Sequence, residues 1–522
     1  MRQHLHPQRR WFRIGAGAGA ALLMATTVAP ADAEPNSNTS EKLRSAVTAD
    51  GVADHLAAFD QIAEENDSTR ASGLPGYLAS RDYVLDRLEE AGYSPSVQAF
   101  DFPFFRELTP ATMRQVTPEA TTYDNPEDFL SMTYSFSGEV TGTVVPVDTD
   151  GQPTETSTSG CEAADFEGFP EGSVALVQRG TCPFGLKADN AEQAGAVAVI
   201  VFNRGTEGAT EPVAGTLGSP LVEIPVVGAS HEVGLDLMDP AGTTVQIQSD
   251  TESEMRETWN VFAQTAGGDA ANVVMAGAHL DSVAAGPGVN DNGSGSATLL
   301  EVAEQMSTVR PVNKVRFAWW GAEELGLLGS THYVTDLAER APSRLQDLAL
   351  YLNFDMVGSP NYVRFVYDGD NSRFPVGPSA AKGPEGSGAI ERLFHDYFGS
   401  QDLASEETPF SGRSDYGPFI AEGIPAGGLF TGAEGVKTEE QARIFGGEAG
   451  VAYDECYHEA CDDLANINMD AIDEMSDAVA HAILTYAMDT GSVNGDRKGH
   501  PVTPPGRHTT GRLASVLAFP GH

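Results

Sequence analysis

Basic residues are scarce in this 522-residue chain, where 31 Lys and Arg stand against 75 Asp and Glu and the formal net charge is −44. A surface this negative repels nucleic acid and anionic lipid, so we expect neither as a partner. No long acidic run accounts for the charge. We therefore interpret it as a solvated surface rather than as an acidic binding tail.

Long apolar segments are also lacking, because after the first residues no stretch reaches the roughly 18 apolar residues that a membrane span needs. The N-terminus differs: a basic segment precedes a small, apolar one, and Ala31-Asp32-Ala33 fits a small-x-small cleavage site. Residues 1–33 are thus interpreted as a signal peptide, which predicts a secreted, extracellular protein with no membrane domain. The segment 9–12, RRWF, resembles a twin-arginine signal, so the Sec and twin-arginine routes both stay open.

Cysteine is rare, with four residues in the whole chain. In an exported protein this number suggests two disulfides. The pairs Cys456–Cys461 and Cys161–Cys182 lie five and twenty-one residues apart, which favours local pairing over the two crossed alternatives. A four-cysteine zinc site would need closer clustering.

The chain is too long for one ordinary hydrophobic core, and changes in residue composition along it predict several domains and segments. Residues 34–50 are polar and resemble a loose leader, and residues 491–522 form a tail rich in Pro and Gly. Between about 126 and 255, short apolar runs divided by Gly, Pro, Thr and Asp favour strands. Helices are expected at 51–66, 76–92, 295–308, 324–339 and 470–488, and strands at 95–101, 139–147, 173–178, 197–202, 223–227, 272–279, 313–320 and 348–355.

Strands and helices alternate after residue 272, and this alternation predicts a mixed, mostly parallel sheet with helices on both faces, a three-layer α/β fold. In such folds ligands bind at the carboxyl ends of the strands. Each expected strand is followed there by candidate metal ligands. They are His279, Asp281 and Asp291 after the first strand, Glu323 and Glu324 after the second, Asp355 after the third and, farther along the chain, His458.

Each of these residues alone has an ordinary explanation, such as a turn, a helix start or a satisfied polar group. Their occurrence after successive strands is what favours a site for divalent metals, since imidazole and carboxylate groups suit such ions. The motifs GAHLDS…GVNDNGSG, WWGAEELGLLGS, NFDMVGS and CYHEACDD resemble those of the zinc-dependent aminopeptidases of peptidase family M28. The resemblance covers residues 51–125 and 256–490, the expected catalytic domain.

The resemblance implies two Zn²⁺ ions bridged by Asp291, with His279 and Asp355 completing one site and Glu324 and His458 the other. Glu323 would be the general base; on the expected helix, it and Glu324 would point about 100° apart. Asp281 would accept the imidazole N–H of His279. Tyr457 would donate its phenol to the oxyanion. Arg413, Met356, Gly428 and Phe430 would shape the pocket for the substrate's N-terminal residue, Arg413 being otherwise an ion-pair partner of Asp415.

The insert at 126–255 resembles a protease-associated (PA) domain, mainly β, with the segment 179–203 as its marker and a Cys161–Cys182 bridge that would fit. We expect it to be a passive cover without a catalytic role. Asp473 and Asp477 resemble part of a calcium site of related enzymes, but no matching acid is found near the N-terminus. Solvated helix charges are the favoured explanation for this pair.

These expectations converge on a secreted, monomeric di-zinc aminopeptidase that acts on the N-termini of peptides or proteins, with preference for large hydrophobic residues such as Leu. One alternative is a carboxypeptidase of the glutamate carboxypeptidase type, which needs a basic pocket that the few Lys and Arg near the motifs do not favour. Another is a non-catalytic, receptor-like relative. Such a protein would be recognised by the absence of some of the metal ligands. Ligand type alone does not separate zinc from cobalt or manganese.

Overall fold

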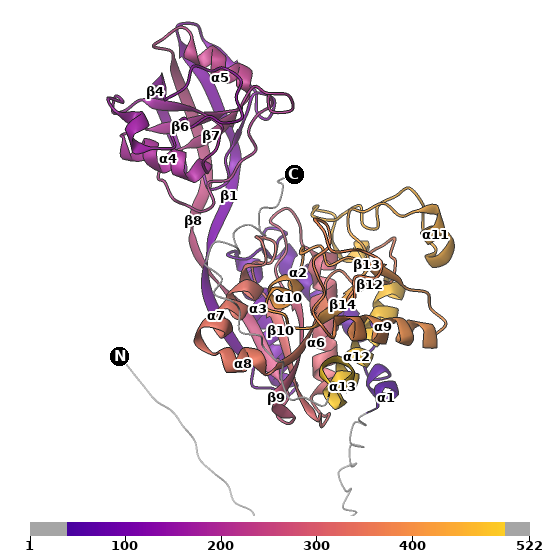
Figure 1. Cartoon of the computed structure of the whole chain (residues 1–522). Helices are drawn as coiled ribbons and strands as arrows, with labels where there is room; N and C mark the ends of the chain where they lie inside the picture. The colour runs from indigo at the N-terminus through magenta and orange to yellow at the C-terminus, as the bar shows by residue number, and fades with distance from the viewer. Residues whose placement is uncertain (1–38, 496–522) are drawn as a thin grey trace, which may run out of the picture.

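Two bodies joined by a long two-stranded ribbon make up the computed structural model, which describes residues 39–495 (Figure 1). The ribbon consists of β1 (Ser96–Thr117) and β8 (Thr244–Gln264), which pair antiparallel from Ser96↔Phe262 to Thr117↔Thr244. Its two ends belong to the larger and the smaller body, so the strands of both bodies are connected in one sheet. The predicted signal peptide, residues 1–33, lies outside the described residues.

The larger body is built on a mixed sheet whose centre is parallel, as predicted. The strands β14, β11, β9 and β10 are parallel to one another, whereas β8 pairs antiparallel with β10 and β12 pairs antiparallel with β14. In spatial order the strands are β13 (Glu406–Thr408), β12 (Phe365–Tyr367), β14 (Ala426–Phe430), β11 (Leu348–Phe354), β9 (Asp269–His279), β10 (Asn313–Trp320), β8 and β1.

Helices cover both faces of this sheet because its strands are apolar on both sides. In β11, Leu350 and Leu352 point into one apolar layer, and Leu348 and Tyr351 into the other. The first layer contains α2 (Ala49–Glu64), α3 (Pro75–Glu90), α6 (Gly295–Met306), α9 (Ser387–Ser400) and α12 (Met469–Met488), and the second α7 (Leu328–Arg340), α8 (Pro342–Gln346) and α10 (Tyr416–Ala421). The three-layer α/β fold is thus confirmed.

The smaller body corresponds to the expected insert, and its core is a parallel run of four strands. The Cys161–Cys182 disulfide, with an S–S distance of 2.01 Å, confirms the local pairing. Two helices that the sequence did not predict pack on these strands. The elements are β2 (Thr121–Tyr123), β3 (Phe129–Ser131), β4 (Gly138–Pro146), η1 (Ala163–Phe166), β5 (Val174–Gln178), α4 (Phe184–Gln193), β6 (Ala198–Phe202), β7 (Val226–Ala229) and α5 (His231–Met238).

Several expected boundaries differ from the structure. The end of the expected leader is folded: α1 (Ser40–Arg44) packs on α12, and Leu43 and Val47, four residues apart, are buried. The strand expected at 95–101 continues to Thr117, and β8 was not expected, because an alternating two-stranded ribbon carries no continuous apolar run. Near the C-terminus, α13 (Gly491–Asn494) buries Val493, so the first residues of the predicted tail are helical, and residues 496–522 lie outside the described part of the chain. No helix within residues 39–495 is long and apolar enough to cross a membrane.

Candidate metal centre

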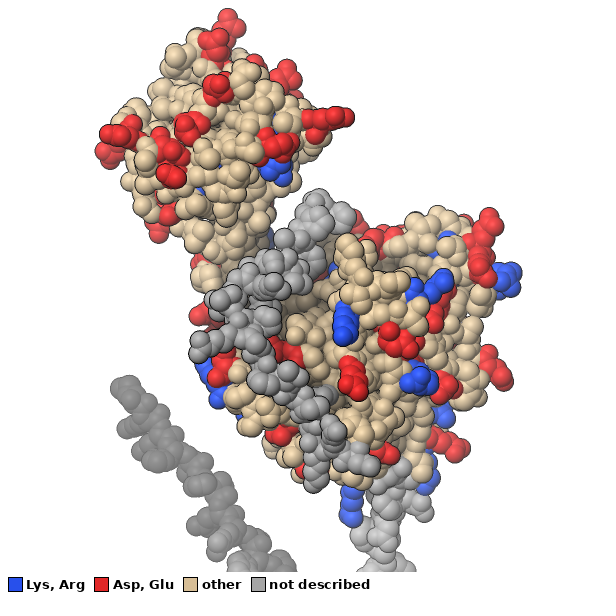
Figure 2. Space-filling model, in the orientation of Figure 1, with Lys and Arg blue, Asp and Glu red and all other residues tan. Residues whose placement is uncertain are grey.

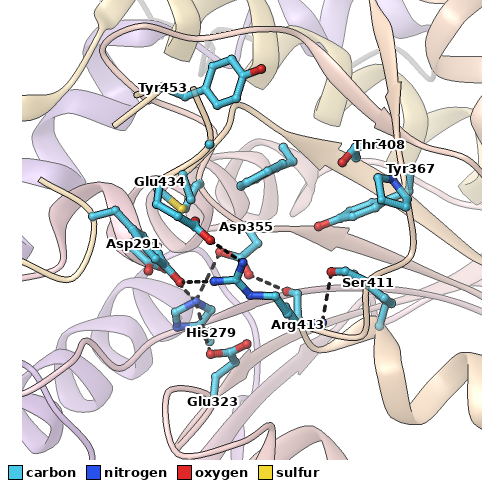
Figure 3. Close-up of a pocket in the computed structure, with 18 of the residues that line it drawn as sticks. His279, Asp291, Glu323, Asp355, Tyr367, Thr408, Ser411, Arg413, Glu434 and Tyr453 are labelled. Carbon is cyan, nitrogen blue, oxygen red and sulfur yellow. Dashed lines mark hydrogen bonds and ion pairs between the residues drawn. The ribbon is translucent and has the colours of Figure 1, made fainter. Parts of the chain in front are cut away.

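The five predicted metal ligands meet at the carboxyl edge of the parallel strands, and Figure 3 labels three of them, His279, Asp291 and Asp355. His279 is the last residue of β9, and Asp355 directly follows β11. Asp291 lies in the irregular turn Val289–Ser294, next to a cis peptide bond with Asn292. Glu324 follows β10, and His458 lies in the loop closed by the predicted Cys456–Cys461 disulfide, whose S–S distance is 2.03 Å.

The carboxylate of Asp291 stands between two histidines. Its Oδ1 lies 3.2 Å from Nε2 of His279, which is also 3.3 Å from Oδ1 of Asp355. Its Oδ2 lies 3.2 Å from Nε2 of His458, which is also 3.1 Å from Oε2 of Glu324. Each oxygen of Asp291 thus faces a different histidine and a different second carboxylate.

These spacings fit two bound cations. Ligands that surround a tetrahedral ion at about 2.0 Å are separated from one another by roughly 3.3 Å. The four distances around Asp291 fall close to this value. In addition, Oε1 of Glu324 is buried without a hydrogen-bond partner among the described residues, which is costly unless a cation is bound. The donor set therefore fits a two-metal site.

Burial concentrates negative charge here. It raises the pKa of Glu324 to about 7, with a further contribution from the nearby Asp291. Burial also raises the pKa of Asp281 to about 6 and that of Glu323 well above the ordinary carboxyl range. Asp291 is buried as well, but hydrogen bonds from His279 and other neighbours lower its pKa. Several carboxylates without enough cationic partners are what a metal-binding site requires.

Two residues that the sequence did not single out hold the Asp291 turn. Arg70 is fully buried, and its guanidinium donates to the main-chain oxygens of Leu280, Pro287 and Gly288. The carboxylate of Asp462 accepts the N–H groups of Asn290 (2.8 Å) and Asp291 (3.0 Å). Asp462 lies in the motif CYHEACDD and could have been suspected from it, whereas Arg70 stands in no motif.

Glu323 and Glu324 do not start a helix, contrary to the prediction. Left-handed backbone at Gly326 (φ 102°) and Leu327 (φ 59°) delays α7 until Leu328. The turn nevertheless separates the two side chains: Oε2 of Glu323 lies 4.0 Å from Nε2 of His279, and Glu324 faces His458.

Asp281 supports this site differently from the prediction. Nδ1 of His279 lies 3.0 Å from the main-chain oxygen of Asp281 and 3.8 Å from its carboxylate. The carbonyl therefore accepts the imidazole N–H. The carboxylate accepts the N–H of Glu323 instead, at 3.2 Å, and so positions the turn that carries the expected base.

A buried hydrogen-bond chain supports Asp355. Ser414 donates to its Oδ2 at 2.5 Å, and Asn353 donates to the Ser414 hydroxyl at 2.8 Å. The Tyr351 phenol donates to Asn353, and the Trp320 indole donates to that phenol. This chain leaves Oδ1 of Asp355 facing His279.

A pocket of about 260 Å³ opens beside the metal ligands. Met356 and Phe430 line it, as predicted, but Gly428 does not. Gly428 is buried within β14, where a side chain would collide with the main-chain oxygen of Asn353. A glycine is therefore needed at position 428 for the close packing of β14 against β11. Further lining residues that the sequence did not predict are Tyr367, Thr408, Pro409, Ser411, Tyr416, Ala433, Glu434, Gly435 and Tyr453.

Arg413 lies at this pocket and links two side chains (Figure 3). Its guanidinium pairs with Glu434 at 2.6 Å and donates to the phenol oxygen of Tyr457 at 3.1 Å. The alternative pairing with Asp415 is not formed, since Asp415 is fully buried. The Tyr457 ring also stacks on His458, with ring centroids 3.8 Å apart. The phenol is thus held beside the metal ligands.

The suggested calcium pair is arranged differently. Asp477 accepts a hydrogen bond at 3.0 Å from Arg44, which comes from α1. Asp473 is exposed on the same helix. Asp477 is therefore paired with a guanidinium rather than only solvated, whereas the exposed Asp473 agrees with the favoured explanation.

Comparisons with known proteins agree with this architecture. Residues 260–483 match the model of peptidase family M28, and residues 140–237 match that of the PA domain. An aminopeptidase of Pseudomonas aeruginosa is 49% identical over 85% of this chain and 81% of its own length. Leucine aminopeptidase 2 of Trichophyton equinum is 47% identical over 66% of this chain and 67% of its own. The solved structure of an aminopeptidase from Aneurinibacillus sp. strain AM-1 aligns with a TM-score of 0.58 and 26% identity, over 85% of this chain and 95% of that one.

Proposed function

The chain belongs to peptidase family M28 and is a metallo-aminopeptidase, and we propose that it is a secreted di-zinc enzyme that cleaves the N-terminal peptide bond of peptides. The observation that carries the two-metal proposal is the position of Asp291, whose two oxygens face two different histidines. Secretion rests on the sequence of residues 1–33 alone.

The donor set assigns the ligands. His279, Asp355 and one oxygen of Asp291 would hold one zinc ion, and Glu324, His458 and the other oxygen would hold the second. Imidazole together with carboxylate is a usual donor set for zinc. When bound, the two ions would acidify a water molecule and polarise the scissile carbonyl.

The protein's own residues supply proton transfer and orientation. Glu323 would accept the proton of the attacking water and return it to the leaving amine, a role that suits a buried carboxylate with a raised pKa. Asp281 holds its main chain in place. Tyr457 would donate its phenol proton in a hydrogen bond to the developing oxyanion, and Arg413 fixes the direction of that phenol.

The pocket suits a large apolar N-terminal residue such as Leu. Its walls include Met356, Phe430 and four tyrosines, and the carboxylates of Glu323 and Asp355 also line it, where they could receive a free α-amine. Arg413 is the one Lys or Arg among the lining residues, and Glu434 already pairs with it. A free cationic pocket for a substrate carboxylate is therefore lacking in the described residues, which argues against the carboxypeptidase alternative.

The PA body supplies none of the described residues that line the pocket. We propose that it limits access to the site without taking part in the reaction. Because all five ligands come from one chain, a monomer suffices for activity.

A comparison of leucine p-nitroanilide with its N-acetylated form tests this function. The free amine should be hydrolysed and the blocked substrate should not, because the acetyl group removes the charge that Glu323 and Asp355 would bind. A metal chelator should abolish the activity. Equal hydrolysis of the blocked substrate, or activity that a chelator leaves intact, would rule the proposal out.

A further inference from the structure

A second cluster of metal-ligand side chains lies away from the pocket, between α9 and β13. It consists of Glu391, His395 and Glu407, and one ligand atom of each lies within 4.8 Å of the others. Glu391 and His395 are four residues apart on α9 and so share a face of the helix. Glu407 is the middle residue of β13, the last strand at this edge of the sheet.

The two ring nitrogens of His395 are in different situations. Nδ1 lies 2.7 Å from the hydroxyl of Ser405. Nε2 is buried and has no hydrogen-bond partner among residues 39–495. Metal-binding histidines commonly show this division, in which one nitrogen contacts a supporting polar group and the other is left for the ion. A buried nitrogen without a partner is otherwise unfavourable.

We propose that Glu391, His395 and Glu407 bind a third zinc ion through Nε2 of His395 and one oxygen of each carboxylate. One imidazole and two carboxylates form a donor set that zinc accepts, with a fourth position open to water. Calcium prefers six to eight oxygen ligands, so the histidine favours zinc. This site goes beyond the proposed function and does not depend on it.

A neighbouring all-oxygen cluster explains which part of Glu391 is already used. Asp368 and Asp370 also lie close to Glu391. The carboxylate of Asp368 is occupied, because it accepts the N–H groups of Ser372, Arg373 and Phe374. Oε2 of Glu391 accepts the N–H groups of Gly369 and Asp370. The loop thus satisfies these oxygens and leaves Oε1 of Glu391 for the ion.

The position of Glu407 connects this site to the substrate pocket. Thr408 and Pro409 follow it directly and line the pocket wall. Within the sheet β13 pairs with β12 alone. An ion held between β13 and α9 would therefore stabilise an edge strand that continues into the pocket, and its loss should raise KM for leucine substrates more than it lowers kcat.

Zinc stoichiometry of the full chain tests the proposal. The metal-free protein is titrated with Zn²⁺ alone, and bound metal is measured by mass spectrometry and by calorimetry. The wild type should bind three equivalents, and His395→Ala and the nearly isosteric Glu407→Gln should bind two. Ser405→Ala should weaken the third equivalent about 10- to 100-fold. His332→Ala is the matched control, because His332 is half-buried, stacks on Phe100 and should leave three equivalents.

Equal zinc stoichiometry in the wild type, His395→Ala and Glu407→Gln would overturn the third site, whatever the total number of ions bound. Anomalous diffraction at the zinc edge should place the extra ion between α9 and β13. The result is separable from the proposed function. If His395→Ala binds one ion fewer than a wild type that lacks aminopeptidase activity, this site is supported and the function is rejected. If the wild type is active and both variants bind as many ions as it does, the function is supported and this site is rejected.

Discussion

The two bodies of this protein bury charge for different purposes. In the larger body, carboxylates and histidines converge at one edge of the sheet, and some of their buried atoms have no partner within the described chain. In the PA body the cores are apolar, and the buried Lys187 donates its ammonium group to the main-chain oxygen of Ser159. All clusters of potential metal ligands found among residues 39–495 lie in the larger body. Buried carboxylate and imidazole atoms without a partner thus lie near candidate metal sites in the larger body, whereas in the PA body the fold itself binds the buried Lys187.

Surface charge does not show this difference. Acidic side chains are scattered over both bodies, and basic ones are few on each (Figure 2). The contrast appears only in the interior. Substitutions of buried charged groups should therefore have unlike consequences in the two bodies, and the predictions below test this from the largest expected effect to the smallest.

Removal of the expected base should have the largest effect. Glu323→Gln keeps the size of the side chain but cannot accept a proton, so kcat should fall about 10²- to 10⁴-fold. Two bound zinc ions should remain, because Glu323 is not assigned as a ligand. Steady-state kinetics and metal analysis check both points. Glu155→Gln in the PA body, which disturbs an exposed pair with Arg204, should change neither. Loss of metal together with activity would contradict the role of Glu323.

Removal of the phenol should be the next largest effect. Tyr457→Phe deletes the expected hydrogen-bond donor to the oxyanion and should lower kcat about 10²- to 10³-fold with a smaller change in KM. Glu434→Gln keeps that donor but weakens the hold on Arg413, so its loss of kcat should be smaller. Kinetics on leucine p-nitroanilide measure the difference. Equal kcat in Tyr457→Phe and the wild type would remove Tyr457 from the reaction.

A substitution of Asp462 tests whether the hydrogen bonds that hold the Asp291 turn contribute to metal binding. Asp462→Asn replaces one of the two carboxylate oxygens that accept the N–H groups of Asn290 and Asp291. Zinc affinity of the catalytic pair should weaken about 10- to 100-fold, as is typical for supporting residues. Competition with a chelator of known affinity measures it. Asp189→Asn, at a partly exposed site in the PA body, is the control, and equal affinities in the two variants would contradict the assignment.

Lys187 gives the smallest effect and concerns pH. Burial lowers the pKa of Lys187 from 10.5 to about 8. Between these values the unfolded chain binds more protons than the folded one, so stability rises with pH from about 8 to 10.5, while the penalty is complete below 8. Relative to Lys187→Met, the wild type should thus gain on the order of 1 kcal/mol over this range. Differential scanning calorimetry at several pH values would measure this. The unfolding transition to follow is that of the PA body, which a metal chelator should leave unchanged. A pH-independent difference would contradict a lowered pKa.

The convergence of the five candidate ligands could be predicted from the sequence because they lie in short motifs after successive strands, where chain order already places them at one edge. It failed where distant segments meet. Arg70 reaches the loop around Gly288 across more than two hundred residues, and nothing near it in the chain indicates this contact. Gly428 was assigned to the pocket because a glycine between apolar residues suits either a pocket or close strand packing. The contact with the main chain of Asn353 on the neighbouring strand, which shows that it serves packing, is not visible in the sequence. The helix start was wrong because Leu327 adopts a left-handed conformation that few non-glycine residues take.

The most direct test is a zinc titration of the metal-free full chain that follows leucine p-nitroanilide hydrolysis. The buried pair at Asp291 should fill first, so the rate at saturating substrate should come close to its plateau at two equivalents of zinc, and a third equivalent should change KM more than this rate. Full activity without metal, or a plateau at one equivalent, would contradict a two-metal site bridged by Asp291.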